Sequence, residues 1–182
     1  MKKLLLTAIF FMTIANVSFA QRTLINKGDQ YLGAKLALGS IGGASTGFIG
    51  TYEMGYMENI GIGGSIAYSG YTDSYNFGLW KGEWTYSNIL VMASGTYHFD
   101  VAKNEKLDTW GALNIGYNVA SASFKWTSNG VPSSAKSPSV SAGGVVIGLS
   151  ANARYMLSEK WYATAGIGFG LGVLNLGVDY KL

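Results

Sequence analysis

The last nine residues, Leu174-Asn175-Leu176-Gly177-Val178-Asp179-Tyr180-Lys181-Leu182, alternate between two kinds of side chain. The even-numbered positions are apolar or aromatic, whereas the odd-numbered ones are Asn, Gly, Asp and Lys. Successive side chains of a β-strand point to opposite sides of the sheet. The period of two therefore predicts a strand with one apolar face and one polar face.

The same alternation occurs in seven further segments. Each has eight or more residues, against a usual five or six for globular strands and about 9–11 for strands that cross a membrane. The eight predicted strands cover residues 31–39, 47–56, 60–71, 86–99, 107–122, 144–156, 161–170 and 173–182.

The two faces of these strands decide where the apolar side chains point. The apolar faces carry no charge, and the opposite faces are mostly Gly, Ser, Thr and Asn, with six charged residues: Lys35, Glu53, Asp108, Arg154, Asp179 and Lys181. A soluble, lipocalin-like barrel would need charge outside, but only 13% of all residues are charged, against about 25% in soluble domains. An apolar face turned to lipid avoids a large apolar patch in water, and closure leaves no strand edge unpaired in hydrocarbon. We therefore predict an all-β fold, a single eight-stranded antiparallel up-and-down transmembrane barrel.

Composition excludes several other classes of function. A chain of 182 residues fits one domain. It has no Cys, which excludes disulfides, Cys-ligated zinc or iron–sulfur sites and thiol catalysis, and its single His leaves little room for a metal site. We expect no cofactor, no bound metal and no nucleic-acid partner.

The first 20 residues have the pattern of a secretory signal peptide. Lys2 and Lys3 precede an apolar run, and small residues occupy the two positions before Gln21 that a signal peptidase reads. The alternative is an N-terminal anchor, but the run is short for the roughly 20 residues of a spanning helix. We expect residues 1–20 to be cleaved, 21–30 to form a short periplasmic segment and 31–182 to form the barrel. Without the two lysines the net charge falls from +3 to +1, so the basic pI has no bearing on partners.

The connections predict an orientation. If the N-terminus is periplasmic, the inward connections are short and polar, and the outward ones include the two longest, residues 72–85 and 123–143. Outer-membrane barrels show this asymmetry and have aromatic girdles at both interfaces. We expect one girdle of Tyr56, Tyr97, Phe99, Tyr155, Trp161 and Tyr180, and a second of Phe48, Tyr68, Tyr117 and Phe169.

Over residues 30–182 the chain resembles the small eight-stranded outer-membrane barrels of Gram-negative bacteria, the OmpX/OmpA-like families. The last strand is similar to the C-terminal signal that outer-membrane assembly machinery reads, with Leu176, Val178, Tyr180 and Leu182 as its apolar positions, although Leu182 stands where Phe is commoner. The resemblance implies a monomer in the cell outer membrane. It implies contact with outer-membrane lipid, lipopolysaccharide, periplasmic chaperones and the assembly machinery.

The six inward charges allow two interpretations. They form an ion-pair network that fills the lumen with Asn114, Asn118 and Asn152, or they line a permeation path or proton relay. We favour the network, because an eight-stranded barrel is just wide enough for side chains to fill.

Two further features suggest chemistry only weakly. His98 could serve a lipid-modifying enzyme of the same fold, but such enzymes act at the extracellular rim, whereas His98 is expected at the periplasmic end. We expect it to cap a strand or to join the charged network. The glycines of residues 166–172 recur every two residues, and no helix follows, so they do not match a dinucleotide fingerprint.

The second outward connection is rich in aromatics, and we take Tyr75, Phe77, Trp80 and Trp84 as possible surface contacts. The alternative is an extended hairpin whose rings pack on one another. The third connection is rich in Ser, which predicts a flexible polar surface.

We hypothesise a non-enzymatic outer-membrane protein with a structural or surface-interaction role, in adhesion or envelope integrity, through its extracellular loops. Deletion of residues 73–83 should then spare folding. The alternatives are a narrow, porin-like passive pore lined by Gly, Ser and Asn, and a lipid-modifying enzyme that uses His98.

Overall fold

The computed structural model describes residues 24–41, 44–78, 80–128 and 135–182. The predicted signal peptide, residues 1–20, lies outside this part of the chain. Eight strands form one closed antiparallel barrel in chain order, which confirms the predicted fold. They are β1 (Gln30–Ile41), β2 (Ala44–Met57), β3 (Ile60–Phe77), β4 (Trp80–His98), β5 (Leu107–Trp126), β6 (Ser139–Met156), β7 (Trp161–Phe169) and β8 (Leu174–Lys181). Within the described ranges, no helix is long and apolar enough to cross a membrane.

The first and last strands close the ring. β1 pairs with β8 from Tyr31↔Lys181 to Leu38↔Leu174, so the C-terminal strand lies beside the N-terminal strand. We call the end of the barrel where Gln30 and Lys181 lie the terminal end, and the opposite end the hairpin end.

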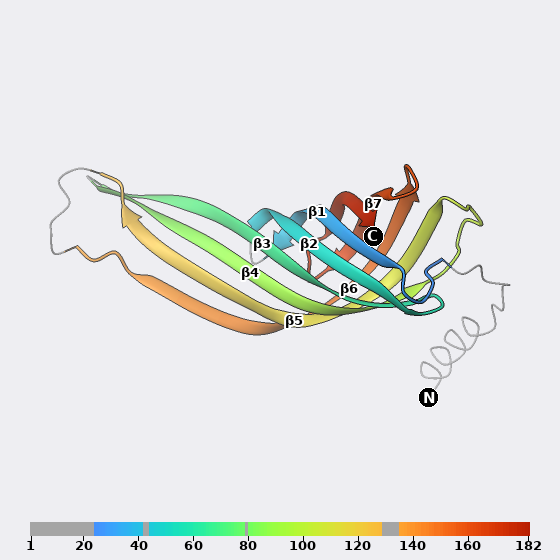
Figure 1. Ribbon diagram of the computed structural model, residues 1–182. Coiled ribbons are helices and arrows are strands. Elements are labelled where there is room, and N and C mark those ends of the chain that lie inside the picture. The colour runs from blue at the N-terminus through green and yellow to red at the C-terminus, as the bar shows by residue number, and fades with distance from the viewer. Residues whose placement is uncertain (1–23, 42–43, 79, 129–134) are drawn as a thin grey trace, which may run out of the picture.

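Four strands rise above the others at the hairpin end. β3 to β6 each have 18 to 20 residues, whereas β7 and β8 have nine and eight. Figure 1 shows these four strands as a sheet that extends well beyond the ring. We call the part of β3–β6 beyond the ring the protruding sheet.

The protruding sheet corrects two predicted loops. Residues 72–85 are not a loop, because β3 and β4 stay paired up to Phe77↔Trp80, and Gly78, which follows β3, takes a φ of 73°. Residues 123–143 are a shorter connection than predicted, because β5 continues to Trp126 and β6 begins at Ser139. The predicted ends of β3 to β6 lie where the outward face of these strands becomes polar, although the hydrogen-bonded ladder continues beyond them.

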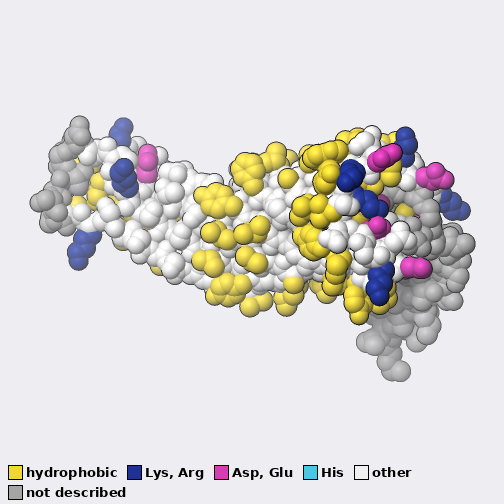
Figure 2. Space-filling model, viewed as in Figure 1, with side chains coloured by type: hydrophobic (Ala, Val, Ile, Leu, Met, Phe, Trp, Pro, Cys, Tyr) yellow, Lys and Arg dark blue, Asp and Glu magenta, His cyan; other side chains and the backbone are white. Residues whose placement is uncertain are grey.

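An apolar band surrounds the ring. Leu36, Phe48, Ile66, Leu113 and Ile147 are among its exposed side chains. Along β4 and the residue that follows it, the band runs from Ile89 to Phe99. This is about 34 Å of extended chain at ~3.4 Å per residue, or about 26 Å of height at a tilt of about 40°. Transmembrane barrels have a band of about 25 Å. Figure 2 shows the hydrophobic side chains over the ring and the charged ones at the two ends of the molecule.

Residues 24–29 cross the terminal end and hold the β2–β3 turn. The Gly28 amide donates to the Gly55 carbonyl, and the Asn59 amide donates to the Ile25 carbonyl. Ile25 is fully buried and packs with Tyr31 and Tyr162. This segment therefore covers part of the terminal opening.

Candidate functional site

Arg154, on β6, is buried in the lumen between two carboxylates. Its Nη1 lies 2.9 Å from Oε2 of Glu53 on β2, and its Nη2 lies 2.6 Å from Oδ2 of Asp108 on β5. Arg154 is 1% exposed. Asp108 is the cross-strand partner of Arg154 on the neighbouring strand, whereas Glu53 reaches the guanidinium from across the lumen. Because a buried guanidinium without partners would cost several kcal/mol, these two carboxylates stabilise it.

His98, at the end of β4, joins the same pair of carboxylates. Its Nε2 lies 3.0 Å from Glu53 Oε1, and its Nδ1 lies 2.8 Å from Asp108 Oδ1. The Thr96 hydroxyl donates to Glu53 Oε1 at 2.6 Å. His98 is fully buried, so a substrate at the membrane surface cannot reach its ring.

Three aromatic rings surround the guanidinium. Arg154 Cζ lies 3.6 Å from the ring centre of Tyr31, 4.9 Å from that of Trp110 and 5.9 Å from that of Tyr162. The Trp110 ring also stacks on His98 at 5.4 Å. Cation–π attraction, which is strongest for desolvated pairs, adds to the ion pairs. We call Glu53, His98, Asp108, Arg154 and these three rings the charge layer.

The remaining predicted lumen charges form separate pairs. Lys35 Nζ lies 3.4 Å from Asp179 Oδ1, inside the barrel. Lys181 is at the terminal end, where its Nζ lies 2.8 Å from Oδ1 of Asp29, outside the strands. Burial raises the pKa of Asp29, but hydrogen bonds from Lys181 and Asn26 outweigh it and leave that pKa below its ordinary value.

A small polar cavity lies next to the charge layer, and an apolar layer lies beyond it. The cavity has a volume of about 80 Å³ and is lined by Lys35, Asp179 and the amides of Asn114, Asn152 and Asn175, among others. The apolar layer packs Ala37, Ile49, Ala67, Leu90 and Met92 inside the ring, with Val146 and Leu171 against them. The lumen is therefore filled in layers and leaves room for a few waters.

The sequence analysis did not predict the three aromatic side chains of the charge layer or the apolar layer. Tyr31, Trp110 and Tyr162 occupy inward positions of the alternation, and so do Ile49, Leu90 and Met92. Their inward parity could have identified them, but most residues of the inward face are small and polar, and these dominate the pattern.

The second candidate site is the protruding sheet, whose inner face continues the lumen wall. Aromatic rings cover it in a chain of contacts. Tyr71 stacks on Tyr86 at 4.6 Å, Tyr86 on Trp84 at 6.2 Å, Trp84 contacts Phe124 at 5.3 Å, and Phe124 contacts Trp126 at 4.9 Å. We call these five residues the aromatic face.

The outer side of the same sheet is polar. Thr72 faces Thr85 across β3 and β4, and Ser74 donates to Glu83. The outer face therefore changes from apolar to polar above Tyr68 and Ile89, and above the same level the inner face carries the aromatic rings. Because an outward row of hydroxyls would be unfavourable in hydrocarbon, the part of the outer face suited to lipid ends at this level.

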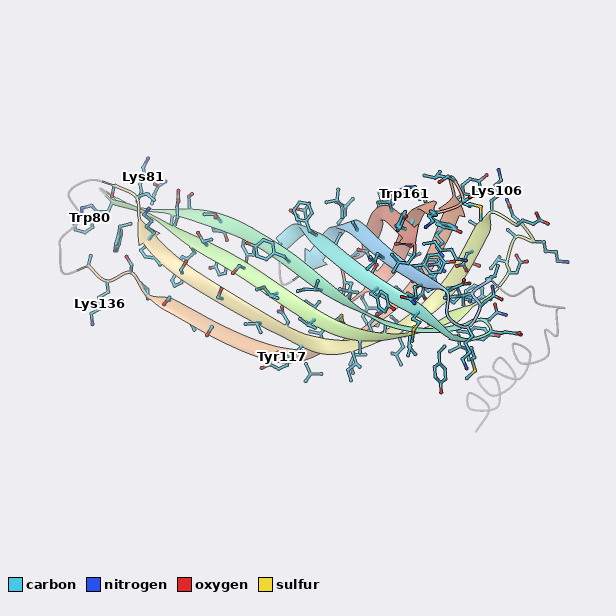
Figure 3. The ribbon with its side chains drawn as sticks, in the orientation of Figure 1. Trp80, Lys81, Lys106, Tyr117, Lys136 and Trp161 are labelled. Atoms are coloured by element: carbon cyan, nitrogen blue, oxygen red, sulfur yellow. The ribbon has the colours of Figure 1, made fainter. Side chains whose placement is uncertain are left out.

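The predicted surface contacts lie on this sheet in two ways. Trp84 belongs to the aromatic face, and Tyr75 and Trp80 are exposed near the tip; the backbone of Phe77 pairs with that of Trp80. Figure 3 labels Trp80, Lys81 and Lys136 at the tip, far from Trp161 and Lys106 at the terminal end. The predicted assembly signal lies on β8, where Tyr180 packs edge-on against Trp161 at 5.0 Å.

No family model matches the chain, and the comparison with curated proteins finds no match either. Solved structures do match. The N-terminal β-barrel domain of Pseudomonas aeruginosa OprF is 13% identical, the match covers 86% of this chain and 98% of that domain, and the TM-score is 0.53. The chain has the fold of the small eight-stranded outer-membrane barrels.

Two structures of Ail, the attachment invasion locus protein of Yersinia pestis, also match. The complex with the heparin analogue sucrose octasulfate is 17% identical over 87% of this chain and all of that one, with a TM-score of 0.49. The structure in a phospholipid bilayer nanodisc is 18% identical over 86% of this chain and all of that one, with a TM-score of 0.47. The match to the OprF barrel domain confirms the predicted resemblance to small outer-membrane barrels for the fold.

Proposed function

We propose that this chain is a non-enzymatic protein of the bacterial outer membrane that binds a surface ligand through the aromatic face of its protruding sheet. The observation that carries the proposal is the change of the outer sheet face from apolar to polar at one level, above which the inner face carries the aromatic rings. It indicates that the part of β3–β6 beyond Tyr68 and Ile89 stands in water. Longer elements on the extracellular side are typical of such barrels, which puts the termini in the periplasm.

The aromatic face is suited to binding. Four of its five rings are half-buried and keep part of their surface accessible, whereas Phe124 is buried beneath them. Aromatic rings supply large contact areas at a low entropy cost. Rings on a four-stranded sheet are also held more rigidly than rings on a loop. The ligand is therefore expected to offer flat apolar surfaces, as sugar rings and aromatic side chains do.

The lumen supports neither alternative function. A pore needs a continuous path, whereas the charge layer and the apolar layer both fill the ring. A lipid-modifying reaction at His98 needs access to its ring, which is fully buried between two carboxylates.

Two matched triple variants test the proposal. Trp84→Ser, Tyr86→Ser and Trp126→Ser change the aromatic face, while Glu83→Ser, Thr85→Ser and Lys125→Ser change the outer side of the same strands. Labelled cells that produce the full chain are applied to an array of immobilised oligosaccharides and extracellular-matrix proteins. The wild type and the outer-side variant should bind the same spots, and the aromatic variant should bind none. Equal binding by the aromatic variant, or no binding by the wild type, would contradict the proposal.

A further inference from the structure

The lipid-facing surface has a groove where two small residues meet. Ala34 on β1 pairs with Gly50 on β2, and both point outward. Larger side chains surround them: Ile66 and Val178 on the neighbouring strands β3 and β8, and Leu36 and Phe48 two residues further along β1 and β2. The groove has a volume of about 770 Å³ and a lining that is almost entirely apolar.

A second hollow, of about 300 Å³, lies at the upper end of this groove. The two share Phe48 and Tyr68. The hollow forms because the ladder between β2 and β3 ends at Gly47↔Ser69, while β3 rises further beside β4. It therefore sits at the level where the outer surface changes from apolar to polar.

The lining of the upper hollow is rich in hydroxyl groups. Thr46, Tyr68, Thr72 and Thr85 contribute side chains to it, and the Thr72 and Thr85 hydroxyl oxygens are 3.4 Å apart. None of the described residues that line it is Lys or Arg. Hydroxyls offer donors and acceptors to a polar, hydroxyl-bearing group, whereas a phosphate site would be expected to include cations.

We propose that groove and hollow together hold one saccharolipid of the outer leaflet. An acyl chain fills the groove over Ala34 and Gly50, and the sugar to which it is attached hydrogen-bonds the hydroxyls at the rim. The order of the two parts matches their depth in the membrane, since the apolar part lies within the band and the hydroxyls lie at its upper boundary. The inference rests on the membrane placement of the barrel, and it concerns a different face from the aromatic one.

Filling the groove tests the acyl-chain part. Gly50→Leu adds a side chain there, and its Cβ would meet its nearest atom, Ile66 Cγ2, at 3.6 Å, an ordinary contact. Gly95→Leu is the matched control, because Gly95 is exposed on the lipid face of β4 with nothing within 4 Å of a Cβ. Both variants should still migrate differently before and after boiling, which shows a folded barrel.

Native mass spectrometry then measures lipid retained by the full-length barrel in detergent, with lipid A or phosphatidylglycerol added at equal ratios. Both lipids are anionic, so charge alone does not separate them. The wild type and Gly95→Leu should retain one lipid A each, and Gly50→Leu should retain about tenfold less, which corresponds to about 1.4 kcal/mol. Equal retention by Gly50→Leu and the wild type, or an equal loss in Gly95→Leu, would overturn the site.

The sugar part has its own test. The double variant Thr72→Val and Thr85→Val keeps the shape of the rim and removes two hydroxyls. It should lower the preference for lipid A over phosphatidylglycerol severalfold and leave phosphatidylglycerol retention unchanged. A wild type that shows no preference between the two lipids would refute the sugar assignment. A chain that shows no mobility shift on boiling would instead refute the outer-membrane barrel itself, so the two failures can be told apart.

Discussion

At the scale of single residues, Arg154 is the centre of the lumen. It contacts both Glu53 and Asp108, as His98 does, and it lies against the rings of Tyr31 and Trp110. The sequence places Arg154 inward by its parity, but parity does not reveal which of the inward carboxylates it meets. Asp108 is its cross-strand partner on β5, but the contact with Glu53 on β2 depends on closure of the ring, which brings β2 across the lumen from β6.

Replacement of Arg154 by Met should destabilise the barrel by about 3–5 kcal/mol, because it leaves two buried carboxylates without their cation. Urea unfolding in detergent micelles, followed by the loss of the fast-migrating gel band, measures the change. Arg154→Met combined with Glu53→Gln and Asp108→Asn should recover part of the loss. A single variant as stable as the wild type would show that the charge layer contributes no net stability.

The pair of Asp29 and Lys181 predicts a pH effect. Hydrogen bonds from Lys181 and Asn26 leave the pKa of Asp29 below its usual 3.8. The stabilisation is therefore fully present above the unfolded pKa and is lost as the pH falls through the lower folded pKa. Asp29→Asn should cost up to about 1 kcal/mol at pH 7 and nothing at a pH well below 3.8. A difference between the two proteins that stays constant over this range would contradict the assignment.

At the scale of elements, the ring was predictable and the protruding sheet was not. The terminal ends of β3, β5 and β6, at Ile60, Leu107 and Met156, agree with the predicted ends, because short polar turns mark them. The hairpin ends differ, since β3 runs six residues past the predicted Tyr71 and β4 begins six residues before Tyr86. Alternation of apolar and polar residues detects a strand in lipid, whereas a strand pair in water needs no apolar outer face.

The protruding part of the β3–β4 hairpin should be dispensable for folding. If Asn-Gly replaces residues 74–83, it joins Asp73 to Trp84, which are cross-strand partners, and Asn-Gly forms the turn that two-residue hairpins prefer. The barrel closes below this level, so the mobility shift on boiling should persist.

Deletion of Val91 alone provides the control for that truncation. A one-residue deletion within the ring turns every later side chain of β4 to the other face, so it should abolish the mobility shift. If the truncated hairpin also lost the shift, the protruding sheet would be part of the folding unit.

At the scale of the whole molecule, the barrel combines a filled ring with a sheet whose faces reverse. The apolar layer around Leu90 and the charge layer around Arg154 both occupy the lumen. Their positions follow from inward parity, but their packing requires the closed ring, which local sequence does not encode.

The filled lumen predicts that the protein does not conduct. Purified barrel in planar bilayers should give no single-channel steps above those of an empty bilayer. Arg154→Met, which removes the central side chain of the charge layer, provides a test of whether any conductance passes through the lumen. Steady steps from the wild type that change size in this variant would show that the layers move and that the pore alternative is correct.

The most direct test of the account is the level at which the outer face of β4 leaves the lipid. The chain has no Cys, so single cysteines can be placed at Glu83, Thr85, Val91 and Ala93, all on that face. A membrane-impermeant maleimide applied to intact cells should label positions 83 and 85 and leave 91 and 93 unlabelled, and all four should react after denaturation. Labelling at 91 and 93, or protection at 83 and 85, would contradict a transmembrane barrel with a sheet that stands in water outside the cell.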